Sequence, residues 1–118
     1  MKSQKDSDFE YKNIVLTKYD RENQIRKMKY QNLSNEEINK RLNEIINEVD
    51  VIAKKCFYEC EEIQSIVIPE KIMKIRQNCF EYCKNLTSIQ LPQTLQKINE
   101  RCFKDCNNLK EIKKYLKN

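Results

Sequence analysis

CFYEC, residues 56–60, is the stretch that decides the fold, because close copies of it return as CFEYC at 79–83 and CFKDC at 102–106. These three segments contain all six cysteines of the 118-residue chain, each segment holding one Cys-x-x-x-Cys pair. Cysteines at a fixed spacing serve as metal ligands, as disulfide partners or as small core residues. The rest of the repeated pattern bears on the choice among these three roles.

The similarity extends well beyond the cysteines when the sequence is compared with itself at a shift of 23 residues. Apolar residues then fall into common columns without a gap. These columns are Ile52/Ile75/Ile98, Phe57/Phe80/Phe103, Ile63/Leu86/Leu109, Ile66/Ile89/Ile112, Ile68/Leu91 and Ile72/Leu95. A fixed period of about 20 to 50 residues is typical of a solenoid, in which each unit buries its apolar edge by stacking on the next.

Each repeat contains a short alternating segment that predicts a strand. In SIVIP (65–69) and SIQLP (88–92), every second residue is apolar, which places these residues on one face of an extended segment. Pro69 and Pro92 follow directly and mark a corner, because proline has no N–H for a sheet ladder. The Cys-Phe-x-x-Cys segment carries apolar residues one and four apart, and we expect it to form a single turn of α- or 3₁₀-helix.

Residues 49–118 resemble the BspA-like leucine-rich repeats, whose unit reads I-x-x-x-A-F-x-x-C-x-x-L-x-x-I-x-L-P. The second cysteine of each pair falls on the core cysteine of that family, and the first replaces its small alanine. The chain departs from the pattern in lacking the glycines that often open the helical turn, and in having Lys114 and Tyr115 where earlier repeats have an apolar residue and proline. The resemblance implies a short α/β solenoid of about three 23-residue coils, with parallel strands on its concave side.

The cysteines coincide with the apolar columns, which favours the core-packing role. Zinc is the sharper alternative, since thiols four apart share a face and neighbouring parallel strands lie roughly 4.8 Å apart. Structural zinc sites more often use C-x-x-C pairs, however, and zinc does not explain why the Phe and Ile columns keep the same period. Disulfides between stacked cysteines are a third possibility, although parallel side chains lie side by side rather than facing one another. We therefore expect no metal or other cofactor.

Upstream of the repeats, the sequence predicts a helical cap. Ser34 and Glu37 form a capping-box pattern, and an apolar stripe of Ile38, Leu42, Ile45, Ile46 and Val49 follows them. A helix over 34–48 would cover the open apolar end of the stack. We accordingly divide the chain into a polar, partly disordered arm at 1–33, a capping helix at 34–48 and a solenoid at 49–118. Within the arm, a strand near Ile14 and Leu16 and a weaker second helix are expected, with no assigned role.

Composition excludes several function classes. The chain has no His and no Gly, so imidazole bases and glycine-rich phosphate loops are absent from it. The carboxylates that remain as candidate acid–base groups, Glu59, Glu61, Glu62 and Glu81, occupy non-periodic positions where a solvated face is expected. No apolar run is long enough to span a bilayer, and no signal peptide is visible, so we expect an intracellular protein, with a cell-surface role as the alternative.

We therefore expect a non-enzymatic interaction module that binds a protein or peptide through its concave face. The residues expected to alternate outward on the three strands are Ser65, Val67, Ser88, Gln90, Glu111 and Lys113. A basic nucleic-acid-binding role, drawing on Lys71, Lys74, Lys97 and the lysines of the C-terminal tail, is the alternative alongside zinc; the core assignment of the phenylalanines argues against it. The last coil has no successor in the sequence, and we expect it to self-associate or to pair with a partner.

Overall fold

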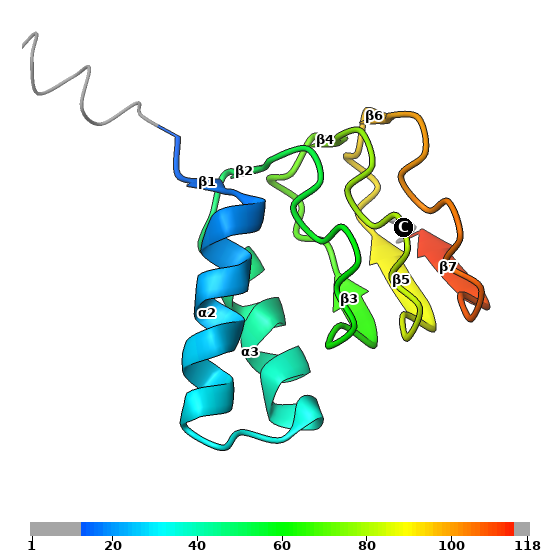
Figure 1. Ribbon diagram of the computed structural model, residues 1–118. Helices are drawn as coiled ribbons and strands as arrows, with labels where there is room; N and C mark the ends of the chain where they lie inside the picture. The colour runs from blue at the N-terminus through cyan, green and yellow to red at the C-terminus, as the bar shows by residue number, and fades with distance from the viewer. Residues whose placement is uncertain (1–12, 115–118) are drawn as a thin grey trace, which may run out of the picture.

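The computed structural model describes residues 13–114, in which one short strand and two helices precede a run of six short strands (Figure 1). Residues 1–12, the first part of the arm expected to be partly disordered, lie outside the described residues. So do residues 115–118, with the tail lysine Lys117.

Two helices precede the repeats, and each begins with a capping box. Helix α2 spans Lys18–Tyr30, where the Thr17 hydroxyl accepts from the Asp20 N–H and the Asp20 carboxylate accepts from the Thr17 N–H. Helix α3 spans Asn35–Ile46 and has the Ser34–Glu37 capping box that the sequence predicts. In its predicted stripe, Ile38, Leu42 and Ile46 are fully inaccessible, whereas Ile45 is only partly buried. Helix α2 also faces the core, with Ile25 and Met28 buried.

The strands form three small parallel sheets. The longest strands are β3 (Ser65–Val67), β5 (Ser88–Leu91) and β7 (Glu111–Lys114), which lie side by side in the order β3-β5-β7 (Figure 1). Strands β4 (Lys74–Ile75) and β6 (Lys97–Ile98) pair on another side of the chain, and β1 (Val15–Leu16) pairs with β2 (Val51–Ile52). In the β3-β5-β7 and β4-β6 sheets, paired residues are 23 positions apart, as in Ile66, Ile89 and Ile112. Equivalent residues therefore stack, as the repeat predicts.

The core is a continuous spine of stacked columns. The Phe57 and Phe80 rings lie 5.2 Å apart and nearly parallel, and Phe80 and Phe103 lie 5.6 Å apart in the same way. All six cysteines are buried and free, beside these rings, as the core-packing interpretation predicted. Burial weakens toward the C-terminal end, where Ile98 is 46% exposed and Ile112 56% exposed.

The Cys-Phe-x-x-Cys segments are not the helical turns that the sequence suggested. In the first of them the Cys56 N–H bonds to the Ala53 carbonyl and the Cys60 N–H to the Phe57 carbonyl, which makes two successive tight turns. Lys55 and Glu59, the third residues of these turns, have positive φ, and so do their equivalents in the later repeats, Asn78, Tyr82, Arg101 and Asp105. The left-handed residues turn alternate N–H groups outward. Those of Lys55, Phe57 and Glu59 therefore bond to the next repeat, which a helical turn would not allow.

Candidate interaction surface

The six residues expected to face outward from the strands lie in two straight rows across the β3-β5-β7 sheet. Ser65 pairs in register with Ser88, and Ser88 with Glu111; Val67 pairs with Gln90, and Gln90 with Lys113. The intervening Ile66 and Ile89 are buried, so the two rows lie on the face opposite the core. The sequence prediction therefore groups six side chains that the structure also brings together.

The character of this face changes from one end to the other. Ser65 and Val67 on β3 are exposed, and Ser88 and Gln90 on β5 are half-buried. On β7 the Lys113 Nζ lies 3.6 Å from the Glu111 carboxylate, and both side chains remain mostly exposed. Hydroxyl, amide, apolar and charged groups thus share one small sheet, which suits shape-based recognition better than chemistry on a substrate.

Helix α3 completes the outer edge of β3 with two asparagines one helical turn apart. The Asn39 Oδ1 accepts from the backbone N–H groups of Gln64, at 2.7 Å, and of Ser65, at 3.2 Å. The Asn43 Oδ1 accepts from the Val67 N–H at 2.9 Å, and its Nδ2 donates to the Ser65 carbonyl at 2.9 Å. These bonds match those between strands, where the N–H groups of Lys110 and Glu111 share the Thr87 carbonyl. The two side chains therefore stand in for a preceding strand.

Helix α2 supplies the equivalent donors for the first Cys-Phe segment through Arg21. The Arg21 Nε donates to the Cys56 carbonyl at 2.9 Å and the Nη2 to the Tyr58 carbonyl at 2.8 Å. In the second repeat the corresponding carbonyls, those of Cys79 and Glu81, accept from backbone N–H groups of the first repeat. Arg21 is 5% exposed, so its guanidinium replaces backbone donors inside the protein.

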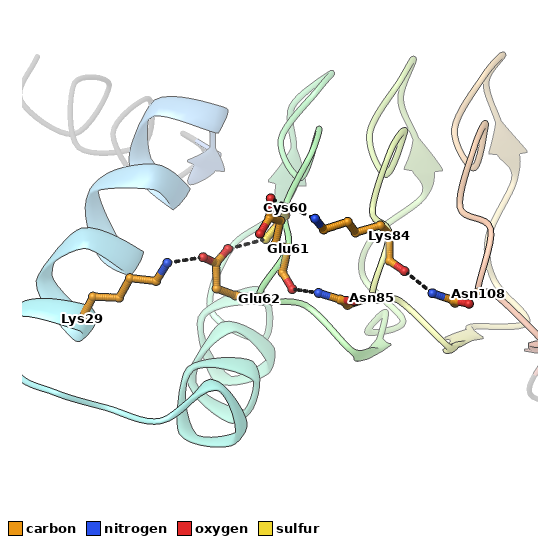
Figure 2. Close-up of polar contacts among 7 residues, drawn as sticks. All are labelled: Lys29, Cys60, Glu61, Glu62, Lys84, Asn85 and Asn108. Atoms are coloured by element: carbon orange, nitrogen blue, oxygen red, sulfur yellow. Dashed lines mark hydrogen bonds and ion pairs between the residues drawn. The ribbon is translucent and has the colours of Figure 1, made fainter.

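A third substitution occurs in the asparagine column that Figure 2 shows. The Asn108 Nδ2 donates to the Lys84 carbonyl at 2.7 Å, and the Asn85 Nδ2 donates to the Glu61 carbonyl at 2.9 Å, so each bond reaches back one repeat. Glu62 occupies the same column in the first repeat, and its carboxylate instead meets Lys29 of α2 at 2.5 Å (Figure 2). Partial burial raises the pKa of the Glu62 carboxyl, but the hydrogen bond and charge of Lys29, together with hydrogen bonds from the Glu62 backbone and Cys60, lower it below its ordinary value.

Most of the thiols have a raised pKa and are therefore poor nucleophiles; Cys106 is the exception. Burial raises the pKa of Cys60 to about 11 and that of Cys79 to about 12. The Cys83 and Cys106 thiols each donate to the backbone carbonyl of a phenylalanine one repeat back, at 2.9 Å. The neighbouring Cys83 lowers the pKa of Cys106, and Cys106 in turn raises that of Cys83. Among residues 13–114, no three His, Cys, Asp or Glu side chains lie close enough together to hold a metal ion.

A family model of the BspA type leucine rich repeat region, in 6 copies, matches residues 7–117. The chain belongs to the BspA-type leucine-rich repeat family. No curated protein and no solved structure matches it. Membership of this family means a solenoid-like α/β repeat fold, and BspA-type repeats are typically non-catalytic interaction modules. The match includes α2 and α3, which the 23-residue repeat of the sequence does not cover.

Three of the four carboxylates considered as acid–base candidates lie in separate ion pairs in this BspA-type chain. Glu61 lies 3.5 Å from Lys84, and Glu62 contacts Lys29. Glu81 is 3% exposed, which corrects the expectation of a solvated face. Its carboxylate accepts a hydrogen bond from Asn78 and lies 3.6 Å from the Arg101 guanidinium, so the buried charge is compensated.

Among residues 13–114, the lysines of the nucleic-acid alternative lie on two different sheets and on the turn that precedes β4. Lys74 and Lys97 are register partners on β4 and β6, and Lys71 lies 3.7 Å from Asp50 beside a cavity of about 330 Å³. Lys113 is on β7.

No helix within the described range 13–114 has the length and apolarity needed to cross a membrane.

The sequence analysis did not predict that four residues of the two helices contact the BspA-type repeats: Arg21, Lys29, Asn39 and Asn43. A signal for two groups was present: Arg21 lies in the stripe of Ile25 and Met28, and the two asparagines lie four apart beside the stripe of α3. The first repeat has backbone groups that no earlier repeat pairs with. Polar residues beside the apolar face of a helix that precedes it therefore indicate contacts to those groups.

Proposed function

We propose that this chain is a non-catalytic module that binds a protein or peptide on the outer face of the β3-β5-β7 sheet, taken as the concave side of about three coils. The observation that carries the proposal is the pair of side-chain rows defined above, Ser65–Ser88–Glu111 and Val67–Gln90–Lys113, held in register on parallel strands. A rigid sheet presents such rows with little loss of conformational entropy on binding.

We further propose that α3, with β1 and α2, acts as the N-terminal cap of the stack. The cap replaces the missing preceding repeat at three places: the Asn39 and Asn43 amides at β3, the Arg21 guanidinium at the first Cys-Phe segment, and β1 at β2. Terminal repeats of a solenoid need such a cover, because their apolar and backbone groups otherwise face water. The cap would thereby keep the binding face in one fixed shape.

The test is a paired substitution at the centre of the face, Ser88→Arg with Gln90→Glu. The matched control is Gln77→Arg with Gln96→Glu, at two exposed positions away from this sheet with the same change of charge. Proteins retained from a native lysate by the wild type and the control should be lost with the face variant, while all three chains keep the same unfolding midpoint. Equal retention by all three would show that this face is not the binding surface.

A further inference from the structure

The two ends of the stack differ in a way that points to a specific mode of self-association. At the N-terminal end, α3 occupies the edge of β3 through Asn39 and Asn43. At the other end, β7 pairs only with β5, and no segment among residues 13–114 pairs with its outer edge. Unpaired sheet edges are templates for pairing with another strand.

Apolar surface is exposed next to this open edge. Ile98 and Ile112 are 46% and 56% exposed, and Leu109 is only partly buried. The Phe103 ring stacks on Phe80 along one face, while no further ring of residues 13–114 stacks on the other. This end therefore carries both unpaired backbone groups and apolar side chains, which are the two requirements of a sheet-extending contact.

The partner that this geometry suggests for the open edge of β7 is another copy of the same chain. Head-to-tail stacking is blocked, because the N-terminal end of each copy already has its edge filled by α3. Only a contact that joins two C-terminal ends remains, and such a contact is isologous and closes as a dimer. Two identical edge strands related by a two-fold axis run antiparallel.

The residues of β7 select one register for this pairing. The Glu111 N–H bonds to Thr87, so Glu111 faces β5 while the N–H and carbonyl of Ile112 face the open edge. A two-fold axis at Ile112 lets the two Ile112 residues exchange hydrogen bonds and sets each Glu111 opposite the Lys113 of the other copy. A shift by two residues in either direction would set Glu111 against Glu111 or Lys113 against Lys113, and a shift by one would set core-facing against outward-facing residues.

We propose that two copies of the chain associate through β7 in this antiparallel register, forming one sheet with three strands from each copy. The outward rows of side chains would then continue from one copy into the other. The inference goes beyond the proposed partner-binding face and does not depend on it, because it rests on the edge of the sheet.

Charge reversal tests the register directly by sedimentation equilibrium of the full chain over a range of concentrations. The wild type should form a reversible dimer. Glu111→Lys and Lys113→Glu should each weaken dimerisation by at least about tenfold, because each sets like charges opposite one another twice per dimer. An equimolar mixture of the two variants should form a heterodimer, since every cross-strand pair is again opposite in charge, and the double variant E111K/K113E should dimerise like the wild type.

A wild type that stays monomeric at millimolar concentration would overturn the proposal. Single variants that dimerise as well as the wild type, or a mixture that fails to pair, would overturn the register. Ile112→Asp provides a second check, because it places two carboxylates at the axis and should abolish the dimer. The Ser88→Arg, Gln90→Glu variant should dimerise normally, so failure of the partner-binding face and failure of the dimer are separately visible.

Discussion

Replacement of Arg21 by alanine should be among the most destabilising single changes on α2. The substitution leaves the carbonyls of Cys56 and Tyr58 without the donors that lie 2.9 and 2.8 Å away. A buried polar group without a partner costs about 1–3 kcal/mol, and the Tyr58 site is only partly buried. The guanidinium also lies 6.0 Å from the Phe57 ring, so packing is lost as well. We expect the free energy of unfolding to fall by roughly 2–4 kcal/mol.

Urea unfolding followed by circular dichroism measures this loss as a shift of the midpoint. Arg26→Ala is the matched control, because Arg26 is exposed on the same helix and its guanidinium donates to the Asn23 side chain rather than to the repeats. Arg21→Met separates the two contributions, since it keeps most of the apolar stem and removes the hydrogen bonds. If Arg21→Ala unfolds at the same urea concentration as Arg26→Ala, Arg21 does not replace backbone donors energetically. If Arg21→Met is as stable as the wild type, the hydrogen bonds contribute nothing net.

Three further predictions concern α3, the charge contact of Figure 2 and the thiols. Asn43→Leu removes two hydrogen bonds to β3 and should lower the free energy of unfolding by roughly 1–3 kcal/mol in the same urea assay; no midpoint shift would contradict the edge-filling role. Because Lys29 lowers the pKa of Glu62 below its ordinary value of 4.5, the stabilisation should be present above about pH 4.5 and fade as pH falls below it, so that wild type and Glu62→Gln converge in acid but not at pH 7. Alkylation with iodoacetamide at pH 8, read by mass spectrometry, should modify Cys106 before Cys79; the reverse order would contradict the assigned burial and pKa shifts.

The repeat itself is visible in the sequence because stacking makes each column chemically uniform. Ile66, Ile89 and Ile112 lie in one register, as the 23-residue shift predicts. The turns were misassigned for a physical reason: spacings of one and four are shared by a helical turn and by two tight turns. Without glycine, the sequence gives no sign that residues such as Lys55 and Glu59 adopt positive φ.

The outward face was predictable because alternation in a strand determines which side chains face away from the core. The contacts of the helices were not, because they depend on where α2 and α3 pack rather than on any spacing within the repeats. Arg21 is bonded to residues 35 and 37 positions away, and Asn39 to Ser65, 26 positions away. Long-range contacts between unlike elements leave no periodic signal in one sequence.

Amide hydrogen exchange tests most directly whether the N-terminal helices complete the first repeat. The N–H groups of Gln64 and Val67 bond to side chains of α3, whereas that of Thr87 bonds to the backbone of Gln64. If α3 serves as the missing strand, Gln64 and Val67 should exchange as slowly as Thr87, and Asn43→Leu should speed exchange at Val67 selectively. Exchange at Gln64 and Val67 as fast as at the N–H of exposed Asn13 would contradict that role.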